Sequence, residues 1–419
     1  MNNPIIRFKK VDGSDFSDWK ESSFQEIFEF RSSISLSRSQ LNYTNGEVKN
    51  IHYGDILLKF PSIIHTDNKL IPYINQDCIP NKYDRLEKGD VVFADTAEDY
   101  SLGKAIEIGS TPFRITSGLH TIACKTKLKF ASGFLVYYLN SNFYHRQINK
   151  LATGTKVYSI IKSNIIKTKL RTPSSLEEQQ KIASFFSTLD QKIELNERKV
   201  EALEKLKKGL MQNIFNRKIR FKKDDGTDFP DWKVSELGNI AEIRGGGTPS
   251  TSNSDYWDGN IQWLTPTEID SKYVHESNRK ITESGLANSS AKLLPMGTIL
   301  LTTRATLGAC SINNFNGFVC TNQGFQSLVC KPIVLNEYVY YAITFDEFQK
   351  KITKHASGST FLEISAKNLK KLTIPTPSLE EQRKIADLLS TLDLQIDIKK
   401  KTVSAMRDLK RGFMQQMFI

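Results

Sequence analysis

Three polar loops in the second half of the chain carry side chains suited to binding phosphate groups or the edges of bases. Arg244–Ser250 follows an apolar segment and combines a guanidinium group, glycines and hydroxyls. Thr302–Thr306 contains an arginine, and Thr321–Gly324 contains an asparagine and a glutamine. Backbone N–H groups of such turns bind anions, and arginine, asparagine and glutamine can each make two hydrogen bonds to one base. Each loop alone would also suit an ordinary turn, but their clustering favours nucleic-acid recognition.

The matching loops of the first half have different chemistry. They are Arg31–Arg38, Ala94–Asp99 and Ser117–His120, and the middle loop is acidic. Its carboxylates could accept hydrogen bonds from the amino group of cytosine, face away from a ligand, or belong to a nuclease. We favour recognition, because paired acids without a nearby lysine in a recognisable order are weak evidence for metal-dependent cleavage.

Motifs for cofactors and catalysis are missing from the sequence. The glycine loop lacks the Lys-Ser/Thr of a P-loop, and we find no Asn-Pro-Pro-Tyr/Phe methyltransferase motif and no G-x-G cofactor loop. The five cysteines form no C-x-x-C pair and the six histidines have no ligand spacing, so we expect reduced, structural cysteines and no metal. The sequence predicts a non-enzymatic binding protein that holds no cofactor of its own.

Composition and charge fit a DNA-binding protein of the cytoplasm. The 419 residues carry a net charge of +12 and 39% are apolar, as in soluble globular proteins of several domains. The amino terminus lacks a secretory pattern and no apolar stretch is long enough for a bilayer, so we expect no membrane contact. The helical segments described next are nearly neutral, which leaves most of the positive charge on the globular modules, where a polyanion would bind.

The sequence contains a duplication. The motif Arg-Phe-Lys-Lys, with Asp-Trp-Lys shortly after it, begins at Arg7 and again at Arg220. Leu-Glu-Glu-Gln, followed by Ser-Thr-Leu-Asp, begins at Leu176 and again at Leu379. Between these anchors the two copies agree only sparsely. Drift after duplication would give this pattern, and so would two modules that read different ligands.

Each copy ends in a long amphipathic helix. From Ile182 and from Ile385, apolar residues recur at steps of four and three over nearly five heptads. Serines before Leu176 and Leu379 predict N-caps, with acidic residues near the positive end of each helix. The expected boundaries, in chain order, are a first module at 1–173, a first helix at 174–216, a second module at 217–377 and a second helix at 378–419.

Packing the two helices on each other is the simplest way to bury both apolar seams. An antiparallel pair would hold the modules at opposite ends, related by an approximate two-fold axis. The expected fold is therefore two α/β (α+β) modules joined by two long antiparallel coiled-coil helices. Asn196, Lys207, Lys399 and Lys410 fall on the seams and would fix their register. The alternative is a parallel coiled coil between two copies of the chain.

Several longer motifs add to this layout. Both helices open with Leu-Glu-Glu-Gln-Gln/Arg-Lys-Ile-Ala, and the second module contains distinctive stretches at Gly246–Ser250, Ile281–Pro295, Arg304–Gly308 and Asn322–Phe325. Together with the duplication, they make the chain resemble the specificity subunit of type I restriction-modification systems. The resemblance implies that each module is a target recognition domain for one half of a bipartite, asymmetric sequence in double-stranded DNA. The helices would then set the spacer between the halves.

The resemblance also implies partners and contacts. Two methyltransferase subunits would dock along the helices and restriction (translocase-nuclease) subunits would join them, with S-adenosylmethionine, ATP and Mg²⁺ bound by these partners. The implied DNA contacts of the second module are Arg244, Gly246, Gly247, Thr248, Ser250, Arg304, Thr306, Asn322, Gln323, Ser359 and Thr360. Those of the first module, where the Gly-Gly-Thr-Pro-Ser and Arg-Ala-Thr-Leu-Gly patterns are missing, are Arg31, Arg38, His120 and Lys156. The implied partner-binding helix residues are Ile182, Phe186, Leu189, Ile385, Leu389 and Leu392.

Two other functions are open on the sequence alone. A stand-alone architectural or regulatory DNA-binding protein would form homodimers through its coiled coil. A self-contained nuclease would use the Asp95–Asp99 region.

Overall fold

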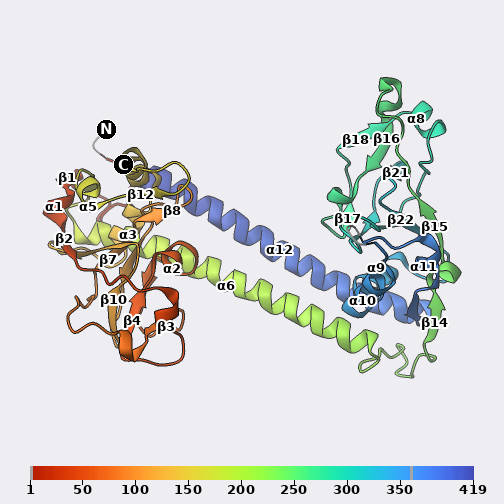
Figure 1. The fold of residues 1–419 in the computed structure, drawn as a ribbon, viewed down its shortest axis with the longest axis horizontal. Helices are drawn as coiled ribbons and strands as arrows, with labels where there is room; N and C mark the ends of the chain where they lie inside the picture. Colours follow the sequence, from red (N-terminus) through yellow and green to blue (C-terminus); the bar gives the residue numbers. More distant parts are fainter. Residues whose placement is uncertain (1–2, 359–361) are drawn as a thin grey trace. The chain divides into compact units, whose positions relative to one another are not determined.

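The computed structural model describes residues 3–358 and 362–419 (Figure 1). The chain divides into two compact units, which we call the first unit (Met1–Glu197 with Lys400–Ile419) and the second unit (Arg198–Lys399). In the part of the chain that is described, no helix combines the length and the apolar character needed to cross a membrane.

The first unit is built around a five-stranded sheet with the strand order β2-β11-β7-β9-β5. Strands β5 and β9 run parallel, and the other neighbours run antiparallel. A smaller sheet has the order β10-β4-β6-β3, with β4 and β10 parallel. The elements are β1 Lys20–Ser23, α1 Phe24–Ile27, β2 Phe28–Arg31, β3 Leu41–Asn42, β4 Val48–Ile51, α2 Tyr53–Leu58, β5 Ile63–Ile64, β6 Tyr73–Ile74, β7 Val91–Ala94, β8 Thr96–Ala97, β9 Ala105–Ile108, β10 Arg114–Ser117, β11 Thr121–Thr126, α3 Phe134–Leu139, α4 Asn142–Leu151, β12 Tyr158–Ser159, α5 Lys162–Ile165, β13 Lys169–Thr172 and the start of α6 Leu176–Phe215.

The central strands of this sheet are apolar on both faces because both faces are covered. Successive side chains of a strand point to opposite sides. Val91 and Phe93 of β7 pack into a core that includes α3 and the first turns of α6, whereas Val92 and Ala94 pack against Ile56 of α2 on the other side. The near-continuous apolar sequence of β7 is thus the signature of a covered sheet.

The second unit repeats this plan. Its main sheet has the order β15-β22-β19-β20-β17, again with the last pair parallel, and a smaller sheet has the order β18-β16-β21, with β16 and β21 parallel. Ile299 and Leu301 of β19 join a core with α9, whereas Leu300 faces a second core. The elements are β14 Lys233–Glu236, α7 Leu237–Ile240, β15 Ala241–Gly245, β16 Trp257–Leu264, β17 Tyr273–Val274, β18 Arg279–Ile281, α8 Glu283–Ala287, β19 Ile299–Leu301, β20 Cys310–Asn313, β21 Val319–Thr321, β22 Gln326–Cys330, α9 Asn336–Thr344, α10 Asp346–His355, α11 Ala366–Lys371, β23 Thr373–Thr376 and the start of α12 Leu379–Met417.

The two long helices contact each other in an antiparallel sense. In the first unit, Asp190 and Glu197 of α6 pair with Lys410 and Arg407 of α12, so rising residue numbers on one helix meet falling numbers on the other. The predicted fold of two mixed α/β modules with long helices in contact is therefore confirmed. This pairing lies within one chain.

The residues expected to fix the helix register are half-buried at this contact. Lys207 lies 2.5 Å from Asp393 in the second unit. In the first unit the amide nitrogen of Asn196 lies 3.9 Å from the sulfur of Met406. Asn196, Lys207 and Lys410 therefore contact the opposite helix, as register-fixing residues do in coiled coils.

A buried carboxylate holds the start of α6. The Glu178 side chain is completely buried and accepts hydrogen bonds from Nε and Nη2 of Arg7, both at 2.9 Å. It also accepts a hydrogen bond from Nε1 of Trp19 at 3.3 Å. We call this set the carboxylate clasp. It ties the amino-terminal motif of the module to the helix that follows it.

The second unit has the same clasp at the start of α12. Glu381 is completely buried and accepts hydrogen bonds from Arg220 at 3.0 Å and from Trp232 at 2.8 Å. The predicted caps are also present, since Ser175 and Ser378 each accept a hydrogen bond from a backbone N–H of the first helical turn at 3.4 Å. The duplicated motifs of the sequence are therefore the parts that attach each module to its helix.

Candidate nucleic-acid interface

The three polar loops of the second unit converge at one end of its main sheet. The N–H of Gly247 donates to the carbonyl oxygen of Thr321 at 2.8 Å, and the Thr248 hydroxyl donates to Oε1 of Gln323 at 2.5 Å. The N–H of Thr303 donates to the carbonyl oxygen of Gly324 at 2.7 Å. Pairing of β15 with β22 brings the loops together, because one loop follows β15 and another precedes β22.

Glycine is required in the first of these loops because of close packing. A Cβ atom added to Gly246 would lie 1.9 Å from the carbonyl oxygen of Asn322, and one added to Gly247 would lie 2.3 Å from the backbone nitrogen of Ala291. Any side chain at these positions would push the neighbouring loop away. The glycines therefore position Asn322 and Gln323 through contact between the loops.

Arg304 is presented on a tight turn between β19 and β20. Ala305 has a φ of 59° and Gly308 a φ of 88°, so the loop turns sharply at both positions. The Arg304 side chain is half-exposed, and its Nε lies 2.9 Å from a carboxylate oxygen of Glu363. Thr306 is exposed, and its hydroxyl lies 3.3 Å from the carbonyl oxygen of Pro266. Arg304 is therefore oriented by one contact and keeps donors for a ligand.

Arg244 is more constrained than Arg304. Its Nε and Nη2 donate to both carboxylate oxygens of Glu242, at 2.9 and 2.8 Å, and its Nη1 donates to the carbonyl oxygen of Leu293 at 3.1 Å. The hydrogen bonds with Glu242 raise the pKa of Arg244. To make two hydrogen bonds to a base, this guanidinium would have to give up hydrogen bonds to Glu242 or Leu293.

Two further predicted positions sit differently. Ser250 shares a hydrogen bond with Ser252, and its carbonyl oxygen accepts from Nε1 of Trp257 at 3.1 Å, so it closes the glycine loop. Ser359 and Thr360 lie outside the described residues.

Two exposed residues near these loops were missed by the sequence reasoning. Thr267 lies in the turn Pro266–Glu268, next to the Thr306 contact. Arg279, at the start of β18, stacks on the ring of Trp257 at 3.5 Å. Stacking of arginine on an aromatic ring holds its planar group in place. The sequence signal for Thr267 was the Thr-Pro-Thr turn. The signal for Arg279 was a pair of basic residues that comes after the strand containing Trp257.

The first unit brings Arg38 and His120 together at the start of α2. Arg38 lies 2.7 Å from the buried carboxylate of Asp55 and 3.4 Å from the hydroxyl of Tyr43, and the contact with Asp55 raises its pKa. His120 packs edge-on against Tyr53, the first residue of α2, with ring centroids 5.2 Å apart. We call Arg38, Tyr43, Tyr53 and His120 the α2 cluster.

The acidic loop of the first unit is tied to this cluster. Nδ1 of His120 lies 3.4 Å from Oδ1 of Asp95, and His120 itself has a φ of 53°. Asp99 accepts a hydrogen bond from the N–H of Ser101 at 2.9 Å. Across residues 3–358 and 362–419, no group of three or more His, Cys, Asp and Glu side chains is placed to hold a metal ion.

Arg31 and Lys156 lie apart from the α2 cluster. Arg31 is mostly buried and pairs with Asp90 at 2.6 Å and with Glu87 at 2.8 Å. Lys156 is exposed in the turn closed by the bridge between Thr153 and Ser159. Arg31 therefore has a structural ion pair in this chain, and Lys156 is accessible.

The structure extends one comparison between the modules. The Arg-Ala-Thr-Leu-Gly pattern is missing from the first module, but Ser101-Leu102-Gly103 occupies the place of Thr306-Leu307-Gly308. Gly103 and Gly308 have φ values of 80° and 88°, and each stands two residues before the next sheet strand. The short strand β8 lengthens the first loop and hides the match. Tyr100, which is 84% exposed, takes the place of Ala305 and was missed.

The helix residues expected to face partners are turned inward. Ile182, Phe186, Ile385 and Leu389 are almost completely buried in the cores of their own units. Leu392 is also buried and Leu189 is partly buried. Beyond the first residue of each helix, the large apolar residues exposed on the same helices are Leu195, Leu206, Leu394, Ile398 and Leu409.

The five cysteines are free thiols. Burial raises the pKa of Cys320 and of Cys330 to about 12. The thiolate is the reactive form of cysteine, so these two side chains are unreactive at neutral pH.

One scaffold used twice, with converging polar loops in each copy and paired helices, defines a duplicated recognition protein. A family profile described as "Type I restriction modification DNA specificity domain" matches residues 17–205 and 230–405. The chain belongs to this family, the DNA specificity subunits of type I restriction-modification systems. In this family the enzymatic activities lie on the partner subunits.

Individual relatives agree with this assignment. The type I restriction enzyme MjaIX specificity subunit of Methanocaldococcus jannaschii is 38% identical over 212 residues, which cover 49% of this chain and 48% of that protein. The chain is thus matched to about half the length of that relative. The putative type I restriction enzyme MjaX specificity subunit of the same organism is 26% identical over 97% of this chain and 94% of its own length. The fold is similar to the crystal structure of a type I S subunit from M. genitalium, with a TM-score of 0.60 at 15% identity, covering 100% of this chain and 99% of that one.

Proposed function

We propose that each unit reads one half of a bipartite, asymmetric DNA sequence. The observation that supports this best is the different chemistry of equivalent loops. The N–H of Thr303 donates to the carbonyl oxygen of Gly324, the third residue after β21. The N–H of Asp95 donates to the carbonyl oxygen of His120, the third residue after β10. The loops that follow β21 and β10 therefore align without a gap. Asn322 and Gln323 then stand where the first unit has Gly118 and Leu119. Different donors and acceptors on the same scaffold select different bases.

In the second unit, Arg304, Asn322 and Gln323 are the proposed base-reading residues. The half-exposed guanidinium of Arg304 suits guanine, and the two amides suit adenine. Gly246, Gly247, Thr248, Ser250, Thr306 and Arg244 support or neighbour these residues. Their proposed role is to fix the loops and to contact phosphate groups.

In the first unit, the α2 cluster takes this role together with Tyr100 and Lys156. Arg38 and His120 offer donors from a rigid base, because Asp55 and Tyr53 hold their side chains. The exposed ring of Tyr100 is suited to contact with a base or a sugar. Arg31 is the weakest candidate because its donors are already bonded to Asp90 and Glu87.

The paired helices are proposed to set the spacer and to bind two methyltransferase subunits, with restriction subunits joining the complex. The exposed residues Leu195 and Leu409 in the first unit and Leu206, Leu394 and Ile398 in the second are suited to such contacts. S-adenosylmethionine, ATP and Mg²⁺ would be bound by these partners. We expect the complex to act in the cytoplasm on chromosomal DNA.

The test is to express this chain with a type I methyltransferase subunit and to sequence the host DNA for methylated bases. The proposal predicts methylation at one gapped, asymmetric motif. The control is the same methyltransferase without this chain. Methylation at no site, or at sites that share no motif, would contradict the proposal.

A further inference from the structure

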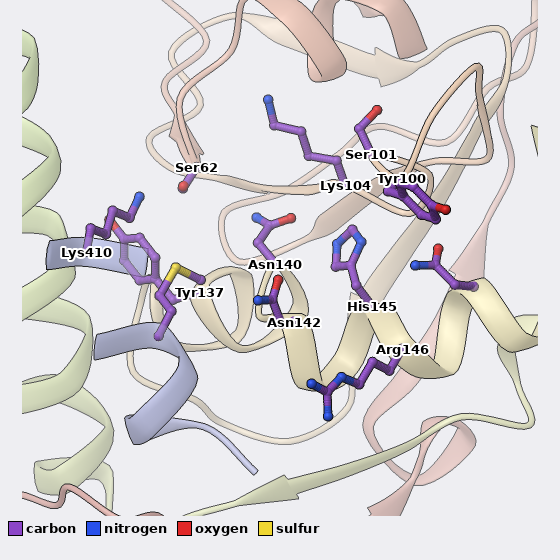
Figure 2. A pocket seen from close by; sticks show the side chains of 12 residues that line it. Ser62, Tyr100, Ser101, Lys104, Tyr137, Asn140, Asn142, His145, Arg146 and Lys410 are labelled. Carbon is purple, nitrogen blue, oxygen red and sulfur yellow. The ribbon is translucent and has the colours of Figure 1, made fainter. Parts of the chain in front are cut away.

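A pocket in the first unit is lined by cations and amides. It has a volume of about 570 Å³ and lies between the loop before β9, helix α4 and the last turns of α12 (Figure 2). Lys104 comes from the loop, Arg146 from α4 and Lys410 from α12. None of the described residues that line it is an aspartate or a glutamate. Its size is that of a typical small-molecule site.

One face of α4 supplies much of the pocket wall. Asn142, His145, Arg146 and Asn149 are spaced by three and four residues, so they lie on the same side of the helix. Asn142 is the first residue of α4, and the amino-terminal end of a helix carries partial positive charge. Among the described residues, no hydrogen bond or ion pair engages the Arg146 guanidinium, so its donors face solvent.

The other two cations are only partly neutralised. The Lys104 ammonium donates to the carbonyl oxygen of Leu57 at 2.9 Å, which leaves two donors. Burial lowers the pKa of Lys104, and the nearby charge of Lys410 lowers it further. The Lys410 ammonium lies 2.5 Å from Oδ1 of Asp190, and the Tyr137 hydroxyl donates a hydrogen bond to Oδ2 of the same carboxylate. The pocket therefore holds three cations against this single adjacent carboxylate.

The second unit is different at the same place. Ser62 and Lys272 occupy equivalent positions, because the carbonyl oxygen of each accepts a backbone hydrogen bond from the neighbouring sheet strand, at 2.8 and 2.7 Å. Ser62 lines the pocket of the first unit. The Lys272 ammonium instead bonds to the hydroxyls of Tyr341 and Ser390, at 2.9 and 2.7 Å. Lysine thus fills in the second unit the space that serine leaves open in the first.

The helix start differs as well. Helices α4 and α10 are both ten residues long, and Asp346 begins α10 where Asn142 begins α4. Asp346 pairs with Lys208 at 3.0 Å, so a carboxylate and its cation occupy this side of the second unit. The open, cationic arrangement is therefore a property of the first unit and is not imposed by the shared scaffold.

We propose that the pocket of the first unit binds a phosphate group. Arg146 can hold two phosphate oxygens through parallel hydrogen bonds, and the amides of Asn142 and Asn149 can bond further oxygens. Converging cations without carboxylates in the wall attract anions. The phosphate can come from a free nucleotide or from the backbone of bound DNA, and only the second source rests on the proposed DNA-reading function.

The test uses the full-length chain and three variants, of which Arg146→Glu and the control Lys150→Glu make the same change of charge. Arg146→Glu reverses one charge in the pocket, and Asn142→Asp places there the carboxylate that the second unit has. Lys150→Glu is the control, because Lys150 is exposed on the same helix but does not line the pocket. Binding of inorganic phosphate and of AMP is measured by calorimetry, and binding of duplex DNA is measured at several salt concentrations.

If the source is a free nucleotide, AMP binds the wild type and the Lys150→Glu variant, and the two pocket variants bind at least tenfold more weakly. If the source is DNA, AMP does not bind, but Arg146→Glu weakens DNA binding more than Lys150→Glu and lowers the salt slope by about one. The proposal is overturned if the pocket variants and the control behave alike toward AMP, phosphate and DNA. The pocket variants are also tested for methylation at a gapped motif. If they still direct it, the failure of the phosphate proposal leaves the DNA-reading function intact.

Discussion

The first and second units share a scaffold but place opposite charges on it. In the loop before β9 the first unit has Asp99 and Tyr100, whereas in the loop before β20 the second unit has Arg304 and Ala305. The five-stranded sheet has the same strand order in both units. The carboxylate clasp is also the same in both. The difference shows that the sheet and the clasp are common to both units and that the loop chemistry is not, which is the basis for proposing that the loops choose the ligand.

The glycine contacts show the same division within one pair of loops. In the second unit Gly246 packs on the backbone of Asn322, and no side chain fits there. In the first unit the equivalent residue is Ser33, whose hydroxyl shares a hydrogen bond with Ser117 at 2.9 Å. Each unit thus joins the same two loops by a different contact. The loops can change chemistry without disturbing the sheet below them.

The largest effect is expected from breaking the clasp. Glu178→Ala should destabilise the first unit by about 3–5 kcal/mol, because it leaves Arg7 without its buried partner. Glu381→Ala should do the same to the second unit. Hydrogen exchange resolved along the sequence would show which unit opens. Equal opening of both units by either substitution would contradict the independence of the two clasps.

A matched control lies one residue away from the first clasp. Glu177 is half-exposed and pairs with Lys181 along the helix surface. Glu177→Ala should change stability by less than about 1 kcal/mol, because exposed ion pairs contribute little.

The next largest loss of stability is expected at the contact between the loop that contains Gly246 and the loop that contains Asn322. Gly246→Ala should destabilise the second unit by roughly 1–3 kcal/mol, since the added methyl group overlaps backbone atoms. Ser33→Ala in the first unit removes hydrogen bonds but creates no overlap, and should cost about 1 kcal/mol. Thermal unfolding measures both. A larger loss of stability from Ser33→Ala than from Gly246→Ala would contradict this expectation.

Arg304 tests whether the second unit reads a base. Arg304→Ala should weaken binding by about 1–3 kcal/mol for the native half-site and relax the preference at one base pair. Dissociation constants for duplexes altered at single positions of one half-site measure this. Lys350→Ala, which removes an exposed charge from α10, is the control. Equal loss on every duplex would make Arg304 a phosphate contact.

The smallest effect is expected from the helix caps, which are alike in the two units. Ser175→Ala and Ser378→Ala should each lower the free energy of unfolding by about 1 kcal/mol. Each removes the hydrogen bond that a backbone N–H of the first helical turn donates to the serine hydroxyl, and both bonds are 3.4 Å long. Chemical denaturation measures the two values. Clearly unequal values would show that the helix starts differ in ways that their geometry does not reveal.

Sequence reasoning reached the parts of this molecule that are local. The caps and the helix periodicity depend on residues close together in the chain, and the duplication is visible from short motifs that recur. The structure contains all three. Sequence reasoning did not predict that Arg31 would be engaged by Asp90, because sheet packing brings these two residues together from distant parts of the chain. The pairing of Arg244 with Glu242, two residues away on β15, is local, and sequence reasoning did not consider it. Tyr100 was missed because an inserted short strand shifted the alignment of the loops.

The pocket of the first unit was also beyond the sequence. Its wall combines Lys104, Arg146 and Lys410, which are far apart in the chain and meet only after the sheet, α4 and the end of α12 have packed. The individual DNA contacts stay predictions, because they depend on a bound duplex.

The most direct test of the central claim is to replace residues 20–172 by a second copy of residues 233–376. The strand pairs β1 with β13 and β14 with β23 begin and end the two segments, so the exchange keeps the joints to the clasp and the helix. The methylated sites are then mapped in cells that contain a methyltransferase partner. If each unit reads one half-site, the exchanged chain directs methylation to a symmetric gapped motif made of two copies of one original half-site. Retention of the original asymmetric motif would contradict the claim.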